Sequence, residues 1–152
     1  MKREDKELLF HDLCARLPYG VMCSIADYEE EHWNTHGNGS IVKFDDKPVR
    51  ATGVDIDSKI IRLSGSVSSV YASDDFNGLK PYLRPMSSMT KEEKKERLST
   101  FFTVVDTKVG LTPMLSGLKS IEYIDWLNKK MFDYRGLIPM GLAIEAPEGM
   151  YN

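Results

Sequence analysis

The chain has 152 residues, a formal net charge of −3, 41% hydrophobic residues and 28% charged residues. These values are typical of one soluble globular domain, and they argue against collagen-like repeats, disorder and membrane spans. The slight excess of negative charge gives little support to non-specific nucleic-acid binding. No apolar run is long enough for a secretion signal or a membrane helix, so we expect a cytoplasmic protein without membrane contact.

Residues 1–18 predict an amphipathic helix that ends at Pro18. The apolar side chains of this segment recur at steps of three and four residues: Leu9, Phe10, Leu13, Cys14 and Leu17. This spacing places them on one face of a helix. The only cysteines are Cys14 and Cys23, and two cysteines make no disulfide framework in a chain of this size. We expect both to be small buried hydrophobes in a reduced cytoplasm.

Residues 19–84 predict an antiparallel β meander. Strands are expected at residues 21–26, 40–44, 49–56, 60–63, 67–71 and 79–83, with an irregular excursion at residues 27–39. The connections are mostly short, which favours antiparallel neighbours, because a parallel return needs a long crossover. Strands this few and short can bury one face by curling into a partly open barrel of the SH3-like kind.

Residues 85–152 predict a helical layer followed by a tail that wraps the surface. Thr90 and Glu93 form a capping-box pattern, which starts a helix carrying Leu98, Phe101, Phe102 and Val105 on one face. Ser120 is the expected cap of a second helix. We expect its wide apolar surface to pack on the preceding helix and on the sheet: Ile121, Tyr123, Ile124, Trp126, Leu127 and Met131. The tail is rich in glycine and proline and is expected to turn four apolar residues inward: Leu137, Ile138, Leu142 and Ile144. The predicted fold is a single α+β domain over residues 1–152, with two or three C-terminal helices.

Three stretches resemble a family of small proteins of Bacteroides-group bacteria and of their phages and prophages. They are LCARLPYGV at residues 13–21, LKPYLRPMSSMT at residues 79–90, and the blocks FDYRGLI and GLAIEAPEGMY within residues 132–151. The resemblance implies a cytoplasmic bacterial protein of mobile-element origin. It implies no activity, cofactor or catalytic residue.

Patterns that carry chemistry are weak in this sequence. His32 and His36 stand four apart, a spacing that suits a metal on a helix, but Gly37 and Gly39 favour a solvated loop. The aspartate pairs lie at predicted turns, which aspartate caps through its own backbone: Asp45 and Asp46, Asp55 and Asp57, and Asp74 and Asp75. No nucleophile motif is present, and His11 is expected at the surface of its helix. We therefore predict no catalytic residue, no metal site and no cofactor.

The hinge between the two regions, residues 80–90, supplies the remaining candidates. Tyr82 and Arg84, together with Tyr134 and Arg135, have the composition of interface hot spots and are the predicted binding residues. The alternative, which we favour, is that they join the last strand to the helical layer, with Arg135 pairing Glu145 or Glu148. The basic cluster at residues 91–97 is interleaved with glutamates, which indicates a solvated helix face.

We predict a non-enzymatic accessory or interaction module with a protein partner. One alternative is a nucleic-acid-associated accessory protein that uses the barrel surface. The other is a small hydrolase whose site is assembled only in three dimensions.

Overall fold

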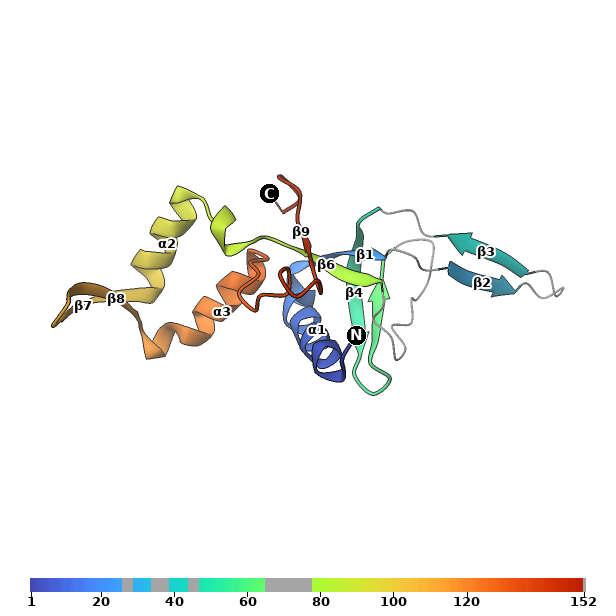
Figure 1. Cartoon of the computed structure of the whole chain (residues 1–152), viewed down its shortest axis with the longest axis horizontal. Coiled ribbons are helices and arrows are strands. Elements are labelled where there is room, and N and C mark those ends of the chain that lie inside the picture. Colours follow the sequence, from blue (N-terminus) through green and yellow to red (C-terminus); the bar gives the residue numbers. More distant parts are fainter. Residues whose placement is uncertain (26–28, 34–38, 44–46, 65–77, 152) are drawn as a thin grey trace.

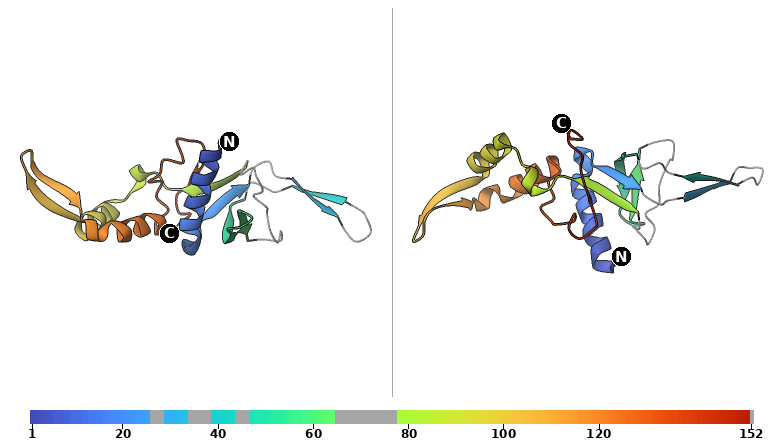
Figure 2. Two further views of the ribbon diagram at one scale, coloured as in Figure 1. Left: turned by 90° about the horizontal axis from the view of Figure 1, so that it is seen from below. Right: turned by 45° about the horizontal axis from the view of Figure 1, so that its top comes forward.

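The computed structural model describes residues 1–25, 29–33, 39–43, 47–64 and 78–151, and for 29–33 and 39–43 only the backbone. The protein is α+β, as predicted, with an N-terminal helix, a five-stranded mixed sheet, two separate two-stranded sheets and C-terminal helices (Figure 1). The helical end and the sheet end lie at opposite sides of helix α1, so the molecule is elongated (Figure 2).

Helix α1 (Arg3–Arg16) has the predicted apolar face, with Leu9, Phe10 and Leu13 buried. The helix runs into a 3₁₀ turn, η1 (Leu17–Tyr19), which Gly20 closes at a φ of 78°. This positive φ favours glycine there, because other residues rarely adopt it.

The central sheet is built around β1 (Met22–Ile25). Its order is β5 (Ile60–Leu63), β4 (Val49–Asp55), β1, β6 (Leu79–Leu83) and β9 (Ile144–Glu145). All pairs are antiparallel except β6 with β9. A meander would place consecutive strands side by side, so this part of the prediction is wrong: β1 lies between β4 and β6. The described strands form an open sheet, and the SH3-like barrel stays a prediction.

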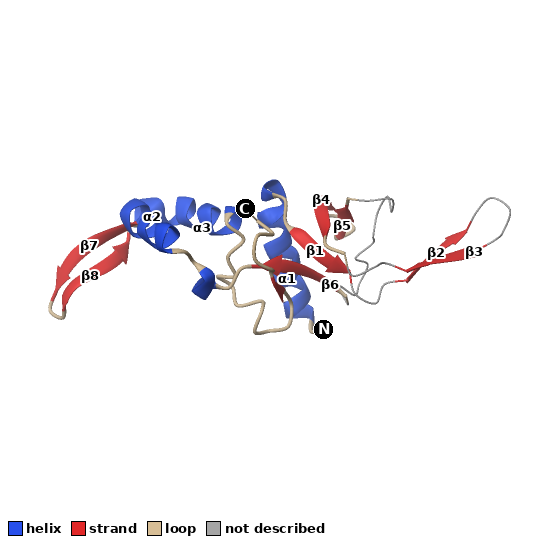
Figure 3. Cartoon of the chain, turned by 90° about the horizontal axis from the view of Figure 1, so that it is seen from above, coloured by secondary structure: helices blue, strands red, loops and turns tan. Residues whose placement is uncertain are grey.

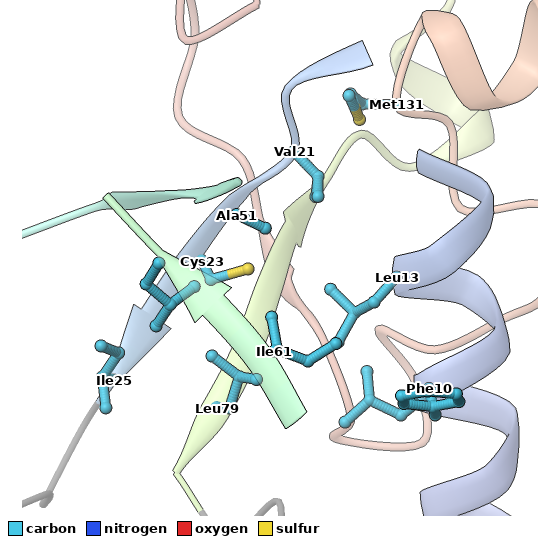
Figure 4. Close-up of a cluster of buried hydrophobic side chains, with 11 residues drawn as sticks. Phe10, Leu13, Val21, Cys23, Ile25, Ala51, Ile61, Leu79 and Met131 are labelled. Atoms are coloured by element: carbon cyan, nitrogen blue, oxygen red, sulfur yellow. The ribbon is translucent and has the colours of Figure 1, made fainter. Parts of the chain in front are cut away.

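The main core lies between α1 and this sheet (Figure 4). Phe10 and Leu13 of the helix face Val21, which precedes β1, and Cys23 and Leu79 of the strands. Cys23 is fully buried, as predicted, and burial raises the pKa of its thiol to about 12, while Cys14 is half-buried against the same core.

Strands β2 (Glu29–Trp33) and β3 (Gly39–Lys43) pair with each other antiparallel in a separate two-stranded sheet. The strand at β3 was predicted, but the prediction of an irregular excursion is wrong for residues 29–33, which form a strand. The expected strand at residues 67–71 lies outside the described residues.

The hinge has the predicted form. β6 leads through Pro85 and a 3₁₀ turn, η2 (Met86–Ser88), to helix α2 (Lys91–Phe101). The capping box is present: the Glu93 N–H donates to Thr90 Oγ1 at 3.1 Å, and the Thr90 N–H donates to Glu93 Oε2 at 2.9 Å.

The helix ends earlier than predicted. After Phe101 the chain forms a hairpin of β7 (Phe102–Thr107) and β8 (Gly110–Leu115), so the placement of Phe102 and Val105 on the helix is wrong. The run Thr103, Val104, Val105 is β-branched and favours a strand, because such side chains are restricted in a helix. Gly110 closes the turn at a φ of 106°.

A second core lies where α2 meets helix α3 (Ser120–Lys129), which follows a 3₁₀ turn, η3 (Gly117–Lys119). Its buried residues are Met89, Phe101, Tyr123, Trp126, Leu127 and Phe132. Two expectations for α3 are wrong. Ile121 is 78% exposed, and Ser120 donates its hydroxyl to the Gly117 carbonyl instead of capping the helix.

The tail wraps the molecule as predicted, with Leu137 and Leu142 buried against Leu83. The carboxylate of Asp133 accepts from the N–H groups of Leu137 and Ile138 at 2.7 and 2.9 Å and thereby fixes the first turn. Strand β9 then pairs with β6, so the end of the chain closes the sheet edge that the hinge leaves open.

Candidate interaction surfaces

Two places are candidates for the functional surface. One is the polar junction around Phe132, which contains three of the four binding residues predicted from the sequence, and the other is the hairpin arm, which was not predicted. The polar junction comprises Asp12, Arg16, Arg84, Glu93, Phe132, Tyr134 and Arg135. The hairpin arm is the β7–β8 hairpin, residues 102–115.

Arg84 spans the hinge. The Arg84 Nη1 and Nη2 atoms each donate to one Glu93 carboxylate oxygen at 2.8 Å. The guanidinium carbon of Arg84, Cζ, lies 4.4 Å from the centre of the Phe132 ring. The Arg84 backbone is fixed as well, because its N–H donates to the Met131 carbonyl and its carbonyl accepts from the Asp133 N–H. Bidentate arginine–carboxylate pairs are among the strong hydrogen bonds of proteins.

The electrostatics of Glu93 reflect this pairing. Hydrogen bonds from Arg84 are the main cause that lowers the pKa of Glu93 to about 2, with further support from the Thr90 N–H and from Lys130, whose Nζ lies 3.7 Å away. The carboxylate is only 11% exposed. Glu93 therefore serves the fold twice, as the capping residue of α2 and as the anchor of Arg84.

Tyr134 and Arg135 lie beside a second ion pair, which is fully buried. Asp12 and Arg16 of α1 have no exposed side-chain surface, and their atoms approach to 2.7 and 3.0 Å. Arg16 also donates to the Phe132 carbonyl at 2.9 Å and stacks on the Tyr134 ring. Arg135 reaches the same carboxylate, with its Nε 3.3 Å from Asp12 Oδ1. The expected pairing of Arg135 with Glu145 or Glu148 is therefore wrong.

Tyr82 contributes through its backbone and lies apart from the other three candidates. It pairs with Ile144 of β9, and its carbonyl accepts from the Tyr151 hydroxyl at 2.8 Å. That hydroxyl also accepts from the Met22 N–H, and burial raises the pKa of Tyr151.

The structure thus brings Arg84 and Tyr134 against the cluster that contains Phe132. The polar groups are paired within the chain: Arg84 donates to Glu93, and Arg135 donates to the Tyr134 hydroxyl and contacts Asp12. This arrangement favours the structural alternative for these residues. Sequence reasoning missed Asp12 and Arg16. The available signal was an aspartate and an arginine four residues apart on a helix, next to the apolar positions Leu9 and Leu13.

The hairpin arm has the opposite character. It projects past α2 and α3, away from the five-stranded sheet (Figure 3). Its only charged residues are Asp106 and Lys108, both near the tip, while Val104 is 67% exposed, Val109 91% and Leu111 76%. Leu118 and Ile121, which follow the arm in the sequence, are 94% and 78% exposed. Large exposed apolar side chains gathered on one element of a folded domain indicate an interaction site.

Two hollows in the surface are weaker candidates for a functional site than the hairpin arm. One of about 1030 Å³ lies between the start of α1 and the β4–β5 turn, and side chains of both charge signs line it, including Arg3, Glu7, Asp57 and Lys59. The turn carries the chemistry predicted for it, since Asp55 accepts from the N–H groups of Asp57 and Ser58 and its pKa is lowered. A hollow of about 480 Å³ beside the hinge has Arg84 in its wall, already committed to Glu93.

The described residues hold no group of three histidine, cysteine, aspartate or glutamate side chains placed for a metal ion. His11 is exposed on α1, as expected, whereas the His32 and His36 side chains lie outside the part of the chain that is described. None of the helices in that part has the length and apolar character needed to cross a membrane.

No protein-family model, curated protein or solved structure matches this chain. Function therefore rests on the geometry of these surfaces.

Proposed function

We propose that this protein is a non-enzymatic interaction module that docks onto a protein partner through the hairpin arm and the adjoining face of α3. The observation that carries the proposal is the exposure of large aliphatic side chains on a structured element. An isolated two-stranded hairpin is marginally stable in water and normally needs further strands or a packed helix. Within the described part of the chain, the arm is packed at its base, where Phe102 lies against Tyr123 with ring centres 5.5 Å apart.

The distribution of charge supports the same surface. The core of a protein–protein interface is depleted of charged residues and surrounded by a polar rim. The arm fits this description, because its aliphatic residues are flanked by Lys108 at the tip and by the pair of Lys119 and Glu122 at the start of α3. The polar junction, whose charges are already paired, is assigned to the stability of the fold.

The resemblance to Bacteroides-group and phage proteins supports a bacterial cytoplasmic setting and a mobile-element origin for this module. We keep the SH3-like, partly open barrel as part of this proposal, supported by the open five-stranded sheet of the described residues. The nucleic-acid and hydrolase alternatives gain no specific support from the described residues: the exposed lysines of α2 alternate with Glu92 and Glu96.

Site-specific photo-crosslinking tests the proposal. A photoreactive amino acid replaces Leu111 on the arm in one variant and Lys95 on the exposed face of α2 in a matched control. In host cells we expect a discrete protein adduct from position 111 that is absent at position 95, and we expect Val104→Lys in the same chain to abolish it. Equal labelling at both positions, or no adduct at position 111, would overturn the assignment of the arm.

A further inference from the structure

The two edges of the hairpin arm are not equivalent, and the difference follows from the hydrogen-bond pattern. The Ser116 N–H donates to the Phe101 carbonyl at 3.1 Å, directly before the first residue pair of the hairpin. In an antiparallel ladder, hydrogen-bonded and non-hydrogen-bonded pairs alternate. The pairs Phe102–Leu115, Val104–Pro113 and Asp106–Leu111 are therefore non-hydrogen-bonded, and their backbone groups point to the outer edges.

Pro113 lies on the outer edge of β8. It has no N–H, so the β8 edge lacks its central donor, and proline is a common means of preventing strand addition. The β7 edge carries no such block. Phe102, Val104 and Asp106 present both N–H and C=O groups outward, at every second residue, which is the pattern that an added strand requires.

We propose that the occupant of this edge is a second copy of the same chain, with β7 paired antiparallel to β7 of the copy across a twofold axis at Val104. This rests on the proposed function and names its partner. The result is a four-stranded sheet in the order β8–β7–β7–β8. A twofold axis at Val104 uses all three outward residues of each strand, whereas a shift by one residue leaves one of them unpaired.

Charge complementarity favours a second copy. With Val104 opposite Val104 of the copy, Asp106 lies opposite the copy's Phe102. In each chain the Arg97 guanidinium lies 5.0 Å from the Phe102 ring centre, and its Nε is buried without a hydrogen-bond partner among the described residues. The pairing thus brings the Asp106 carboxylate to an arginine that has no carboxylate partner within the described part of its own chain. The same contact repeats on the other side of the axis, as an isologous interface requires.

The apolar faces of the two copies also lie side by side in the four-stranded sheet. Val104, Leu111 and Leu115 lie on one face of the hairpin together with Phe102, because directly opposite residues share a face. In the four-stranded sheet this face doubles in width and carries no like-charged neighbours at its centre. A three- or four-stranded sheet is also more stable than the isolated hairpin.

Sedimentation velocity of the full chain over a concentration series, up to about 100 µM, tests the proposal. We expect a reversible monomer–dimer equilibrium that Val104→Pro shifts to monomer, because it removes an outward N–H from β7. The matched control is Leu111→Pro, which removes an outward N–H from β8 and is expected to leave the dimer intact. A chain that stays monomeric throughout, or a dimer equally sensitive to both prolines, would overturn the β7 pairing.

Charge exchange tests the register without a proline. Asp106→Arg is expected to weaken the dimer about tenfold, since it places two arginines together on each side of the axis. Adding Arg97→Glu is expected to restore the dimer. If the double variant is weaker than Asp106→Arg alone, the register is wrong. A monomeric chain that still gives a hetero-adduct at position 111 would refute the second copy and leave the interaction module standing.

Discussion

The polar junction and the hairpin arm differ in what they bury: the junction buries charged side chains, whereas the arm exposes apolar ones. In the junction, charged groups lie out of water and are balanced by one another: Arg16 by Asp12, and Arg84 by Glu93. In the arm, Val104, Val109 and Leu111 are exposed, and no element in the described part of the chain covers them. A buried charge that has a partner within the chain stabilises the fold. For the exposed aliphatic face of an ordered hairpin, we propose instead that a second molecule binds it.

The largest expected effect is in the junction. Asp12→Ala leaves the Arg16 guanidinium buried without its counter-charge, and breaking such a pair costs about 3–5 kcal/mol of unfolding free energy. Urea unfolding followed by circular dichroism measures this loss. Glu7→Ala is the matched control on the same helix, since the Arg3–Glu7 pair has the same spacing but is exposed and is expected to contribute below about 0.5 kcal/mol. Equal losses for the two variants would contradict the account of the junction.

Arg84 comes next. Arg84→Ala removes both hydrogen bonds to Glu93 and the stacking on Phe132, and we expect a loss of about 1.5–3 kcal/mol. Arg84→Lys keeps the charge but not the bidentate geometry, so it should recover only part of the loss. An Arg84→Ala variant that unfolds like the parent while losing a partner would return Arg84 to the binding residues.

The Arg84–Glu93 pair should also make the free energy of unfolding depend on pH. The pKa of Glu93 is lowered to about 2 in the folded chain from a usual value of 4.5. The folded state therefore binds a proton at Glu93 less readily than the unfolded state does. The stabilisation is complete above about pH 5 and is lost as the pH falls toward 2. Glu93→Gln should flatten this part of the urea-midpoint profile, while Glu92→Gln, an exposed neighbour, should leave its shape unchanged.

The smallest effect on stability is expected in the arm. Val104→Lys replaces an exposed side chain, so at dilute, monomeric concentration the free energy of unfolding should change by less than about 0.5 kcal/mol. The same variant should lose self-association in sedimentation velocity. A large loss of monomer stability would show that the arm is packed within its own chain.

The sequence was most informative where local patterns act alone. The amphipathic face of α1, the capping box at Thr90 and the strand before the hinge depend on neighbours within a few residues, and all three were predicted. The end of α2 was not, because Phe102 and Val105 continue the helical spacing while the β-branched run at residues 103–105 and Gly110 favour a hairpin. At residues 102–105 the strand propensity of the β-branched residues therefore outweighs the helical spacing of the apolar residues.

The order of the sheet and the partners of the charged residues could not be obtained in this way. Placing β1 between β4 and β6 depends on long-range pairing, which leaves no local signature. The same holds for Arg135, whose partner Asp12 lies on the first helix rather than in the adjacent tail. The candidate surface itself was missed because exposed aliphatic residues look like core residues until their surroundings are known.

We propose that the charged groups of the polar junction pair within one chain, whereas the outer edge of β7 pairs with a second chain. Amide hydrogen exchange followed by nuclear magnetic resonance at low and high protein concentration tests both halves together. The account predicts that the Val104 and Asp106 amides become protected only as the concentration rises, while the Arg84 and Asp133 amides are protected throughout. Edge amides that exchange equally fast at every concentration, or junction amides whose protection depends on concentration, would contradict it.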